Sequence, residues 1–521
     1  MPVIDPPGTS AESESPAPAA AAPLVAGHPL PPADPRRFKA LAVIAIAQLM
    51  IVLDASIVNL AIPSASADLQ ISPADVQWIV TAYTLTFGGF LLLGGRIADF
   101  WGRKRTFMVG LAGFAIASLI GGLAPTLGLL ITARALQGGF AALLAPAALA
   151  LISVSFHDPK ERSKAFGVMG AISGGGAAIG LLLGGVLTEY FSWRWCLAVN
   201  TPIAIAALLF ARPLITESRA EGDTTYDIPG AITSTLGLVA LVYGFTQAAP
   251  EGFQDSAHWT DPSTVVWFVA AFLLLGAFLV IETRTAHPLL PLRIVKERNR
   301  GGAYLSSLIT GAGLFAMFLF LGLYLQVIKE YTPVQAGFAF LPFSLGIIGA
   351  AGIAANLMPK VGPRPLMAPG LLVAAAGMFW LTRLTPESEY LTGVLPPMVV
   401  MSVGMAFVFI PTATVALHAV GNHDAGVASA VINTSQQVGG SLGTALMNTV
   451  AVTATSAYLA ANADLGEAAL PSALTEGYTQ AFMVGGVLLL VAAVVVLVMI
   501  RIGPSAAAEE DEAAPAAVHF G

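Results

Sequence analysis

Long apolar runs alternate with short polar stretches along most of this 521-residue chain. A helix needs about 20 mostly apolar residues to cross the hydrocarbon of a bilayer. The pattern predicts an all-α, polytopic membrane protein with fourteen transmembrane helices, at residues 39–61, 76–97, 105–125, 128–153, 164–188, 196–212, 228–248, 263–282, 302–327, 335–357, 366–382, 392–417, 427–453 and 479–500. The longer loops are 248–262 and 454–478, predicted outside, and 213–227 and 283–301, predicted inside.

The fourteen segments divide into six, two and six. We therefore expect an N-terminal six-helix bundle, two inserted helices with their flanking loops, and a C-terminal six-helix bundle, at 39–212, 213–300 and 301–501. A weak repeat supports this division, because residues 98–104 align with residues 358–364 in the turn after the second helix of each block. Parallel repeats are typical of transporters. The Pro-, Ala- and Glu-rich ends, 1–38 and 502–521, are predicted to be disordered tails.

The basic residues set the orientation. With the N-terminus placed inside, twenty of the 24 Lys and Arg residues fall in cytoplasmic segments, three fall outside and one lies within a helix. Cytoplasmic loops carry such an excess of basic residues. Both termini are therefore predicted to be cytoplasmic. The N-terminus lacks the layout of a cleaved signal peptide, so the first helix should remain in the protein.

Composition excludes several classes of protein. The chain is 56% apolar and 11% charged, and its net charge of −7 reflects acidic residues in the two tails. A single cysteine, Cys196, excludes an intramolecular disulfide and a cysteine-based metal cluster. No lysine follows a glycine as in the phosphate-binding loops of ATPases, and the seven histidines lack metal-ligand spacing. We expect no metal, no cofactor, no nucleic-acid partner and no enzymatic activity.

Two ionisable residues lie deep in the predicted helices. Asp54 is in the middle of segment 39–61, and Arg134 lies in segment 128–153. Such residues are costly in a bilayer and are candidates for function by default. Burial favours a neutral carboxyl group, whereas a nearby cation favours the carboxylate. If the two side chains meet, Asp54 could take up and release a proton; a purely structural ion pair is the alternative.

The turn between the second and third helices contains glycines, an acid and several bases. Glycines permit a tight turn and close helix approach, and charge-assisted hydrogen bonds can hold two helices in one conformation. We predict a gate at the inner side, formed by Gly95, Arg96, Asp99, Gly102, Arg103 and Lys104. A plain basic loop on the cytoplasmic side would explain the bases but not the acid and glycines.

Segment 164–188 is rich in glycine at four-residue spacing, which lets helices pack backbone to backbone. We predict a hinge or packing surface at Gly170, Gly174, Gly176, Gly180 and Gly184. In the second half, aromatic residues, methionines and amides favour a large, loosely specified ligand. Candidate residues lining a substrate cavity are Asn59, Gln137, Phe315, Phe318, Gln326, Asn433 and Gln437.

Four motifs together resemble the fourteen-helix drug:proton antiporter family of the major facilitator superfamily. They are Leu53 to Pro63; Gly94 to Arg105; Arg134 to Gly139 with Pro146; and the glycine run of segment 164–188, followed by Ser192 to Trp195 and Asn200 to Pro202. The resemblance implies two six-helix bundles around a central cavity in the cytoplasmic membrane of a bacterium. It also implies export of drugs driven by the proton-motive force, with Asp54 in proton coupling and Arg134 as its partner.

Two positions depart from the family pattern. Leu181 follows Gly180 where exporters usually have proline, and Gln436 precedes Gln437 where arginine is common. Proton stoichiometry therefore stays open. We expect a monomer in the lipid bilayer that handles protons and a small amphipathic organic substrate. Alternatives are a dedicated exporter of one secondary metabolite or lipid, an uptake symporter, and a non-transporting receptor or scaffold.

Overall fold

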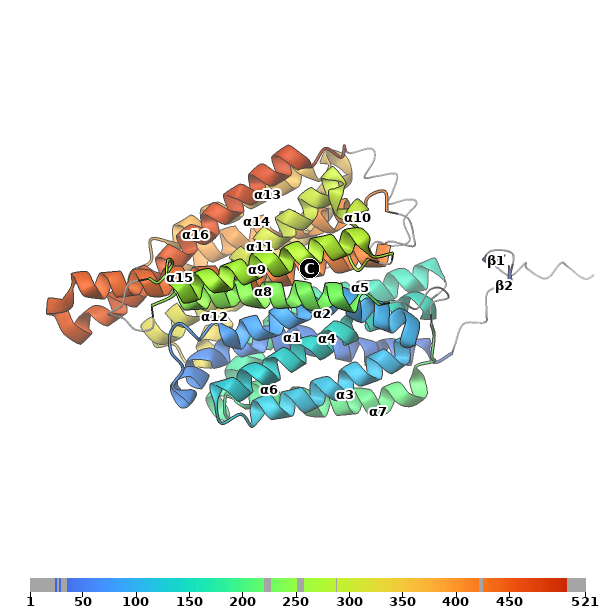
Figure 1. Cartoon of the computed structure of the whole chain (residues 1–521), viewed down its shortest axis with the longest axis horizontal. Coiled ribbons are helices and arrows are strands. Elements are labelled where there is room, and N and C mark those ends of the chain that lie inside the picture. The colour runs from blue at the N-terminus through green and yellow to red at the C-terminus, as the bar shows by residue number, and fades with distance from the viewer. Residues whose placement is uncertain are drawn as a thin grey trace, which may run out of the picture.

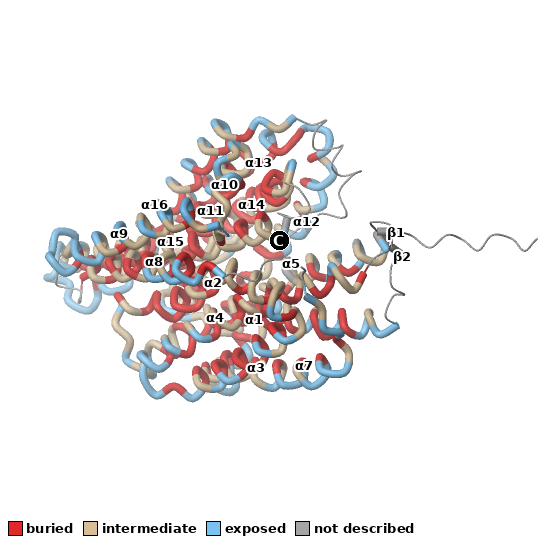
Figure 2. Tube along the Cα trace, turned by 45° about the vertical axis from the view of Figure 1, so that its right-hand side comes forward, coloured by how far each residue is buried: buried red, intermediate tan, exposed pale blue. Residues whose placement is uncertain are grey.

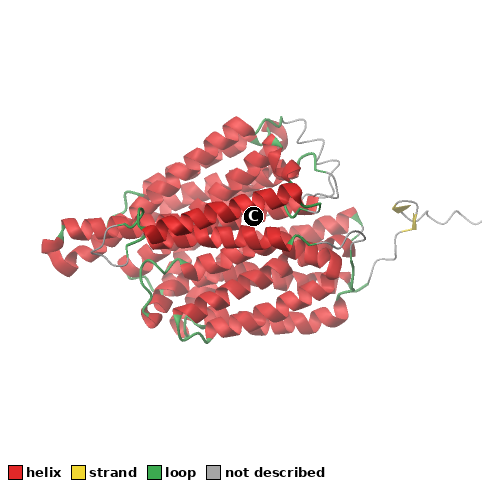
Figure 3. Ribbon diagram, in the orientation of Figure 1, coloured by secondary structure: helices red, strands yellow, loops and turns green. Residues whose placement is uncertain are grey.

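The computed structural model describes residues 35–156, 158–219, 226–250, 257–286, 288–420 and 425–503, together with two residue pairs near the N-terminus. Those pairs, β1 (Leu24–Val25) and β2 (His28–Pro29), form a short antiparallel ladder. The rest of the described chain is almost entirely helical (Figure 3). The predicted tails, 1–38 and 502–521, lie mostly outside the described residues, so their disorder stays a prediction.

Sixteen α-helices make up the described fold (Figure 1). They are α1 (Arg37–Leu69), α2 (Trp78–Trp101), α3 (Arg103–Gly122), α4 (Leu127–Ser155), α5 (Pro159–Tyr190), α6 (Trp195–Ala198), α7 (Asn200–Leu214), α8 (Ile228–Ala248), α9 (Pro262–Arg284), α10 (Leu292–Lys296), α11 (Arg298–Leu323), α12 (Pro333–Val361), α13 (Arg364–Leu381), α14 (Leu395–Leu417), α15 (Ala425–Ala461) and α16 (Leu470–Met499). Two π-helical turns, Tyr324–Ile328 and Tyr390–Val394, extend α11 and α14, and a 3₁₀-helix, Ala463–Ala469, links α15 to α16.

Each predicted segment coincides with one helix, or with the consecutive pair α6 and α7, and runs at most three residues past a helix end when the π-helical turns are counted with α11 and α14. The prediction of an outer loop at 454–478 is wrong, because α15, the 3₁₀-helix and α16 make this stretch helical. Polar residues such as Asn462 and Asp464 interrupt the apolar run there, but the surrounding Ala and Leu residues are good helix formers. Helical structure therefore continues past the end of the apolar pattern.

Twelve helices of the described chain are long and apolar enough to cross a membrane. The count becomes thirteen if the two arms of α5, Lys164–Gly170 and Gly175–Tyr190, which meet at 41°, form one span. Large apolar side chains are exposed, for example Phe272 (79%) and Leu209 (68%). Figure 2 shows exposed positions along the outer sides of the helices that surround the buried interior. An apolar surface of this kind requires lipid rather than water around it. The number fourteen itself stays a prediction.

We call the end of the molecule where α1 begins the inner end, because the basic residues predict that it faces the cytoplasm, and the opposite end the outer end. In the N-terminal half, α1 packs against α5 and α7, and α4 packs against α2 and α3. In the C-terminal half, α11 packs against α15 and α16, and α14 packs against α12 and α13. The inserted helices α8 and α9 pack against each other, and α8 also contacts α2 and α15.

The two halves meet along two equivalent seams. In one seam α2 packs against α15, and in the other α12 packs against α5. Each seam pairs the second helix of one half with the fifth long helix of the other. The repeat seen in the sequence also has a structural counterpart. Gly102 (φ 127°) separates α2 from α3, and Gly362 (φ 80°) separates α12 from α13, both in backbone conformations that favour glycine.

The apolar core is shared differently at the two ends. At the outer end, α1 residues such as Ile57 and Leu60 belong to one continuous buried cluster with the C-terminal half. At the inner end, the N-terminal half has a separate buried cluster that includes Ile44, Phe107 and Leu151. In Figure 1 the ribbons of the two halves lie close at the left-hand end and spread toward the right. The apolar contact between the halves is therefore concentrated at the outer end.

Candidate functional site

Asp54 lies inside the N-terminal half and is fully buried. Its Oδ2 accepts a hydrogen bond from Arg134 Nη1 at 2.7 Å, and this contact is also an ion pair. Its Oδ1 accepts from Gln137 Nε2 at 2.9 Å and from Asn200 Nδ2 at 2.8 Å. Helices α1, α4 and α7 thus each supply at least one member of the cluster. Asp54 and Arg134, whose contact the sequence left open, therefore meet in the structure.

Arg134 is held from several sides, and it too is fully buried. Its Nε donates to Ile79 O at 3.0 Å, its Nη1 also reaches Gln137 Oε1 at 3.0 Å, and its guanidinium lies 4.5 Å from the centroid of the Tyr83 ring. Buried ion pairs persist only when their remaining donors and acceptors are also satisfied. Gln137 completes the network by donating to Ser118 Oγ at 2.8 Å.

Sequence reasoning missed Asn200 as a partner of Asp54, as well as the supporting roles of Ser118 and Tyr83. In the sequence, Asn200 is a polar amide near the start of an apolar segment. It belongs to a motif that resembles the antiporter family, but nothing in the motif links it to Asp54. Gln137, predicted to line the substrate cavity, is fully buried in the Asp54 cluster instead. Two buried polar atoms beside the cluster, Tyr83 Oη and Asn200 Oδ1, have no hydrogen-bond partner in the described chain.

The glycines of α5 bring it against α1, the helix that carries Asp54. A Cβ built on Gly176 would lie 2.8 Å from Val52 Cγ1, one on Gly180 would lie 1.9 Å from Ser56 Oγ, and one on Gly184 would lie 2.5 Å from Ile57 O. These contacts require the absence of a side chain. Gly170 and Gly174 lie in the inner half of α5 and within the bend, respectively. Leu181, found in place of the usual proline, is buried in the shared core.

The predicted gate loop forms a compact turn at the inner end. Asp99 Oδ1 accepts hydrogen bonds from Arg103 Nε at 3.2 Å and Nη2 at 2.9 Å, which joins α2 to α3. Arg96 Nη2 reaches Pro288 O at 3.5 Å, and Lys104 Nζ donates to Arg212 O at 2.7 Å. Gly95 lies near Pro146, because a Cβ atom added to Gly95 would lie 3.7 Å from Pro146 Cβ.

Glu217 is a partner of this turn that sequence reasoning did not single out. Its carboxylate accepts from the backbone N–H groups of Lys104 at 3.0 Å and Arg105 at 3.2 Å. A negative charge at the N-terminus of a helix is favourable, so Glu217 stabilises the start of α3. A Cβ on Gly102 would meet Glu217 Oε1 at 2.7 Å. The backbone conformation of Gly102 therefore favours glycine, and the Glu217 carboxylate lies close to it.

A second polar contact joins α1 to α5 at the inner end. Arg37 Nε and Nη2 each donate to Glu161, at 2.8 Å. These hydrogen bonds lower the pKa of the Glu161 carboxyl from its ordinary value. At the outer end, Asp68 accepts from Arg194 and from Trp193 Nε1, which ties the end of α1 to the turn between α5 and α6.

The other predicted cavity residues are half-buried and come from both halves of the molecule. They are Asn59 on α1, Phe315 and Phe318 on α11, Gln326 in the π-helical turn, and Asn433 and Gln437 on α15. Phe318 packs against the rings of Phe340 and Phe343, with centroids 5.4 and 5.2 Å away. Gln437 lies across the seam from Gly88 of α2. Their role as a substrate cavity stays a prediction.

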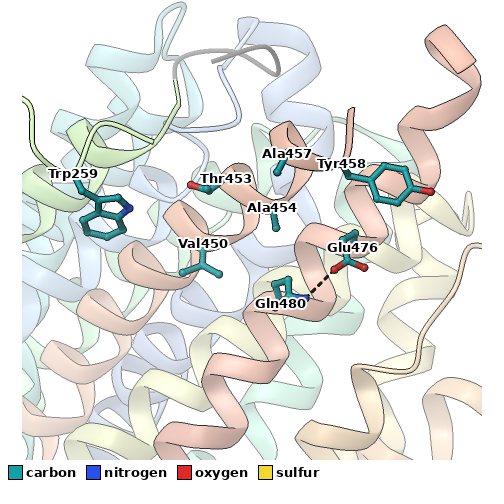
Figure 4. Close-up of a pocket in the computed structure, with 8 residues that line it drawn as sticks. All are labelled: Trp259, Val450, Thr453, Ala454, Ala457, Tyr458, Glu476 and Gln480. Carbon is teal, nitrogen blue, oxygen red and sulfur yellow. Dashed lines mark hydrogen bonds between the residues drawn. The ribbon is translucent and has the colours of Figure 1, made fainter. Parts of the chain in front are cut away.

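A hollow of about 580 Å³ lies elsewhere, between the outer parts of α15 and α16 and the residue Trp259 (Figure 4). Its lining includes Thr453, Tyr458, Glu476 and Gln480, and Gln480 Nε2 donates to Glu476 Oε1 at 2.8 Å. None of the predicted cavity residues lines this hollow. It opens at the outer end and is separate from the Asp54 cluster.

The comparisons with known proteins agree with this architecture. Residues 44–444 match the family model described as Major Facilitator Superfamily. The chain belongs to the major facilitator superfamily. The match extends from the first helix to α15 and includes the Asp54 cluster, the α5 glycines and the gate loop. Members of this superfamily are membrane transporters, so the chain is a multi-pass protein of the cytoplasmic membrane.

Several relatives carry names that refer to resistance or export. The puromycin resistance protein of Streptomyces alboniger is 51% identical over 461 residues, which cover 88% of this chain and 90% of the relative. The cephamycin export protein of Amycolatopsis lactamdurans is 40% identical, covering 80% and 85%. The tetracenomycin C resistance and export protein of Streptomyces glaucescens is 31% identical, covering 79% and 75%. The chain is thus an exporter of the superfamily, similar to actinomycete antibiotic exporters.

Solved structures support the fold alone, because their sequence identity is low. A bacterial homologue of the lysosomal transporter Spinster, in an inward-facing and unoccupied conformation, matches with a TM-score of 0.61 at 18% identity, covering 92% of this chain and 98% of that one. An auto-inhibited peptide transporter of the POT family matches with a TM-score of 0.66 at 16% identity, covering 93% and 100%.

Proposed function

We propose that this chain exports a small amphipathic organic compound from the cytoplasm in exchange for protons, and that Asp54 carries the proton. The observation that carries the proposal is the buried Asp54 cluster, in which one carboxylate is held by a guanidinium and two amides. A buried charge is costly unless it is paired. Protonation would remove the charge of Asp54 and weaken its hold on Arg134.

The cluster can accommodate both protonation states. The amides of Gln137 and Asn200 each have a donor end and an acceptor end. Both donate to Asp54 Oδ1 as the cluster stands, and Asn200 Oδ1 has no hydrogen-bond partner. When Asp54 is protonated, rotation of the Asn200 amide would bring that oxygen round to accept the new O–H. The carboxyl group therefore does not need water at the site to be satisfied.

Proton binding at Asp54 is linked to the packing between the halves through α1. This helix is pressed against α5 by glycines, and it also contacts α11 and α12 of the other half. A change in the hydrogen bonding of Asp54 would therefore change how α1 packs against α5, α11 and α12. With the apolar core shared at the outer end, the molecule suits substrate access from the inner end. We assign Asp99 and Arg103 to the gate on that side.

The proposed substrate class is that of the relatives, small organic antibiotics and similar compounds. In the C-terminal half, aromatic rings and amides stand half-buried along α11 and α15, next to a core rich in methionine. Flexible thioethers and aromatic faces accept varied apolar ligands. Movement of one charge across about 100 mV releases roughly 2.3 kcal/mol, and each 1.4 kcal/mol is tenfold. One proton per neutral substrate would sustain a gradient of roughly fortyfold to fiftyfold, without a cofactor.

The test is transport by purified protein in liposomes with an imposed pH gradient. A panel of lipophilic dyes and antibiotics that includes puromycin is added, and proton flux and substrate flux are both recorded. We expect substrate-dependent proton flux in the wild type and none in Asp54→Asn. Asp68→Asn is the matched control, because Asp68 is also ion-paired and lies on the same helix, but half-exposed at the outer end. Full coupled transport by Asp54→Asn would refute the proposal.

The same experiment separates the alternatives. Response to one compound alone favours a dedicated exporter of a single metabolite. Substrate movement in the same direction as the proton indicates an uptake symporter. Absence of any flux in the wild type, over the whole panel, would favour a receptor or scaffold. A molar mass of one protomer for the protein purified in detergent would support the proposed monomer.

A further inference from the structure

Two buried carboxylates lie outside the Asp54 cluster. In the part of the chain that the structure describes, three carboxylate residues are buried: Asp54, Asp227 and Glu282. Asp227 precedes the first residue of α8, and Glu282 lies in the last turn of α9. The two are each 4% exposed, and both lie at the inner end of the inserted helix pair. Gly244 of α8 lies against Phe268 of α9, and Gly237 lies against Leu275, so the antiparallel register brings Gly230, the residue capped by Asp227, level with Glu282.

Each carboxylate has one oxygen with a partner and one without. Asp227 Oδ1 accepts from Gly230 N at 2.8 Å, and Glu282 Oε2 accepts from Leu290 N at 3.0 Å. Asp227 Oδ2 and Glu282 Oε1 are buried and have no hydrogen-bond partner in the described chain. A buried polar atom without a partner is rare and costly. A single proton between the two groups would satisfy both oxygens.

The cations nearby do not neutralise this pair. Arg96 of α2 binds Pro288 O, and Arg284 and Arg293 lie at the end of α9 and in α10. Among the residues that the structure describes, no basic side chain forms an ion pair with Asp227 or Glu282. Two like charges buried side by side cannot both be ionised cheaply. A proton on one of the two carboxyl groups would remove this repulsion.

The helix ends decide which group holds it. Asp227 caps the N-terminus of α8, where backbone N–H groups and the helix dipole stabilise a negative charge. Glu282 lies at the C-terminus of α9, where the dipole disfavours one. We propose that Asp227 and Glu282 form a second proton-binding site, in which Glu282 carries the proton and donates it to Asp227 Oδ2. The site is separate from Asp54.

The position of the pair links it to the gate loop. Glu282 holds the backbone N–H of Leu290, and Pro288, two residues earlier, accepts from Arg96 of the gate loop. The ring of Tyr226, next to Asp227, packs against Phe100 of α2 at 6.3 Å. Loss of the proton would leave two carboxylates that repel each other at the end of the inserted helices, where these helices meet the gate. A rise in cytoplasmic pH would thus change the contacts between the inserted helices and the gate loop.

The test is infrared spectroscopy of the full-length protein, because the carbonyl stretch of a protonated carboxyl group is separate from the bands of carboxylates. The work is done in an Asp54→Asn background, so that Asp54 cannot contribute and a failure of the transport proposal does not affect the result. At neutral pH we expect a protonated-carboxyl band that disappears in Glu282→Gln. Glu476→Gln, which replaces a half-buried carboxylate at the outer end, should retain the band.

An unchanged band in Glu282→Gln would overturn the proposal. So would a band that appears only when choline replaces sodium, since the pair would then be a cation site. If Glu282→Gln does not fold, Asp227→Asn serves instead. Removing the carboxylate acceptor should shift the Glu282 band to higher frequency, and an unshifted band would contradict the hydrogen bond.

Discussion

The two halves of this transporter bury different polar groups. The N-terminal half buries an Asp–Arg ion pair, Asp54 with Arg134. In the described part of the C-terminal half, from α11 onward, the buried polar residues are serines, threonines and the asparagine Asn448. The methionines show the opposite bias. Among the described residues, eight buried methionines lie in the C-terminal half and two in the N-terminal half.

This difference separates the two tasks of an exporter. A buried ion pair with fixed partners forms one geometry and responds to one small ion. A core of methionines, rings and hydroxyls carries no charge that a substrate must match, and it can repack around different ligands. Since the halves share the same helix arrangement, the difference lies in side chains rather than in the fold. Under the function proposed above, energy coupling would belong to the first half and substrate tolerance to the second.

Arg134→Met should have the largest effect, because it removes one partner of the buried ion pair in the N-terminal half. The substitution leaves the Asp54 carboxylate buried without its cation, and breaking a buried pair in this way costs about 3–5 kcal/mol. We expect a large fall in the thermal unfolding midpoint in detergent. The double variant Arg134→Met with Asp54→Leu should recover most of that loss, since a buried pair can be replaced by apolar residues. Equal stability of the single variant and the wild type would contradict the prediction.

Gly180→Ala should have the next largest effect, on the contact between α5 and the helix that carries Asp54. The new methyl group would lie 1.9 Å from Ser56 Oγ and 3.2 Å from Leu53 O. Overpacking of this kind costs about 1–3 kcal/mol. Lower stability and slower coupled transport are expected.

Gly175→Ala is the matched control, because a Cβ on Gly175, in the same helix, meets nothing within 4 Å. Adding Ser56→Gly to Gly180→Ala should restore part of the stability by removing the closest obstacle. A Gly180→Ala protein as stable as the control would show that α5 and α1 do not need this close approach.

The sequence predicted the fold and the centre of the site because both depend on strong local signals. A charge within an apolar run stands out, so Asp54 and Arg134 were found, and the four-residue glycine spacing identified the face of α5 that contacts α1. Asn200 and Gln137 are amides that look alike in sequence. The tertiary structure alone places Asn200 beside Asp54 and moves Gln137 from the predicted cavity to the same cluster.

Other features depend on contacts between distant segments. Glu217 lies in a polar stretch with nothing to mark it, and its role appears only when the chain after α7 returns to the start of α3. Asp227 and Glu282 are 55 residues apart and look like ordinary charges at the ends of two helices. Their burial follows from the packing of α8 against α9, which hydrophobic patterns do not specify.

Asn448→Ala should have the smallest effect, and it tests whether an uncharged contact of the C-terminal half is enough to hold the outer end closed. Asn448 Nδ2 donates to Pro73 O at 3.1 Å and Ala74 O at 3.2 Å, both between α1 and α2. Each such hydrogen bond contributes about 0.5–1.5 kcal/mol. Because about 1.4 kcal/mol is tenfold in an equilibrium, the variant should raise the population of outer-open molecules severalfold.

Distances between spin labels can measure this population. Tyr190→Cys and Glu330→Cys place exposed labels at the outer ends of α5 and just before α12, in a Cys196→Ala background. Asn433→Ala is the control, because Asn433 Nδ2 donates to Ser429 O of its own helix. More long distances in Asn448→Ala than in the control would show that an amide alone can bias the outer end. Equal distance distributions would show that the shared apolar core, rather than Asn448, holds the outer end closed. The C-terminal half would then stabilise the closed outer end by packing rather than by hydrogen bonds.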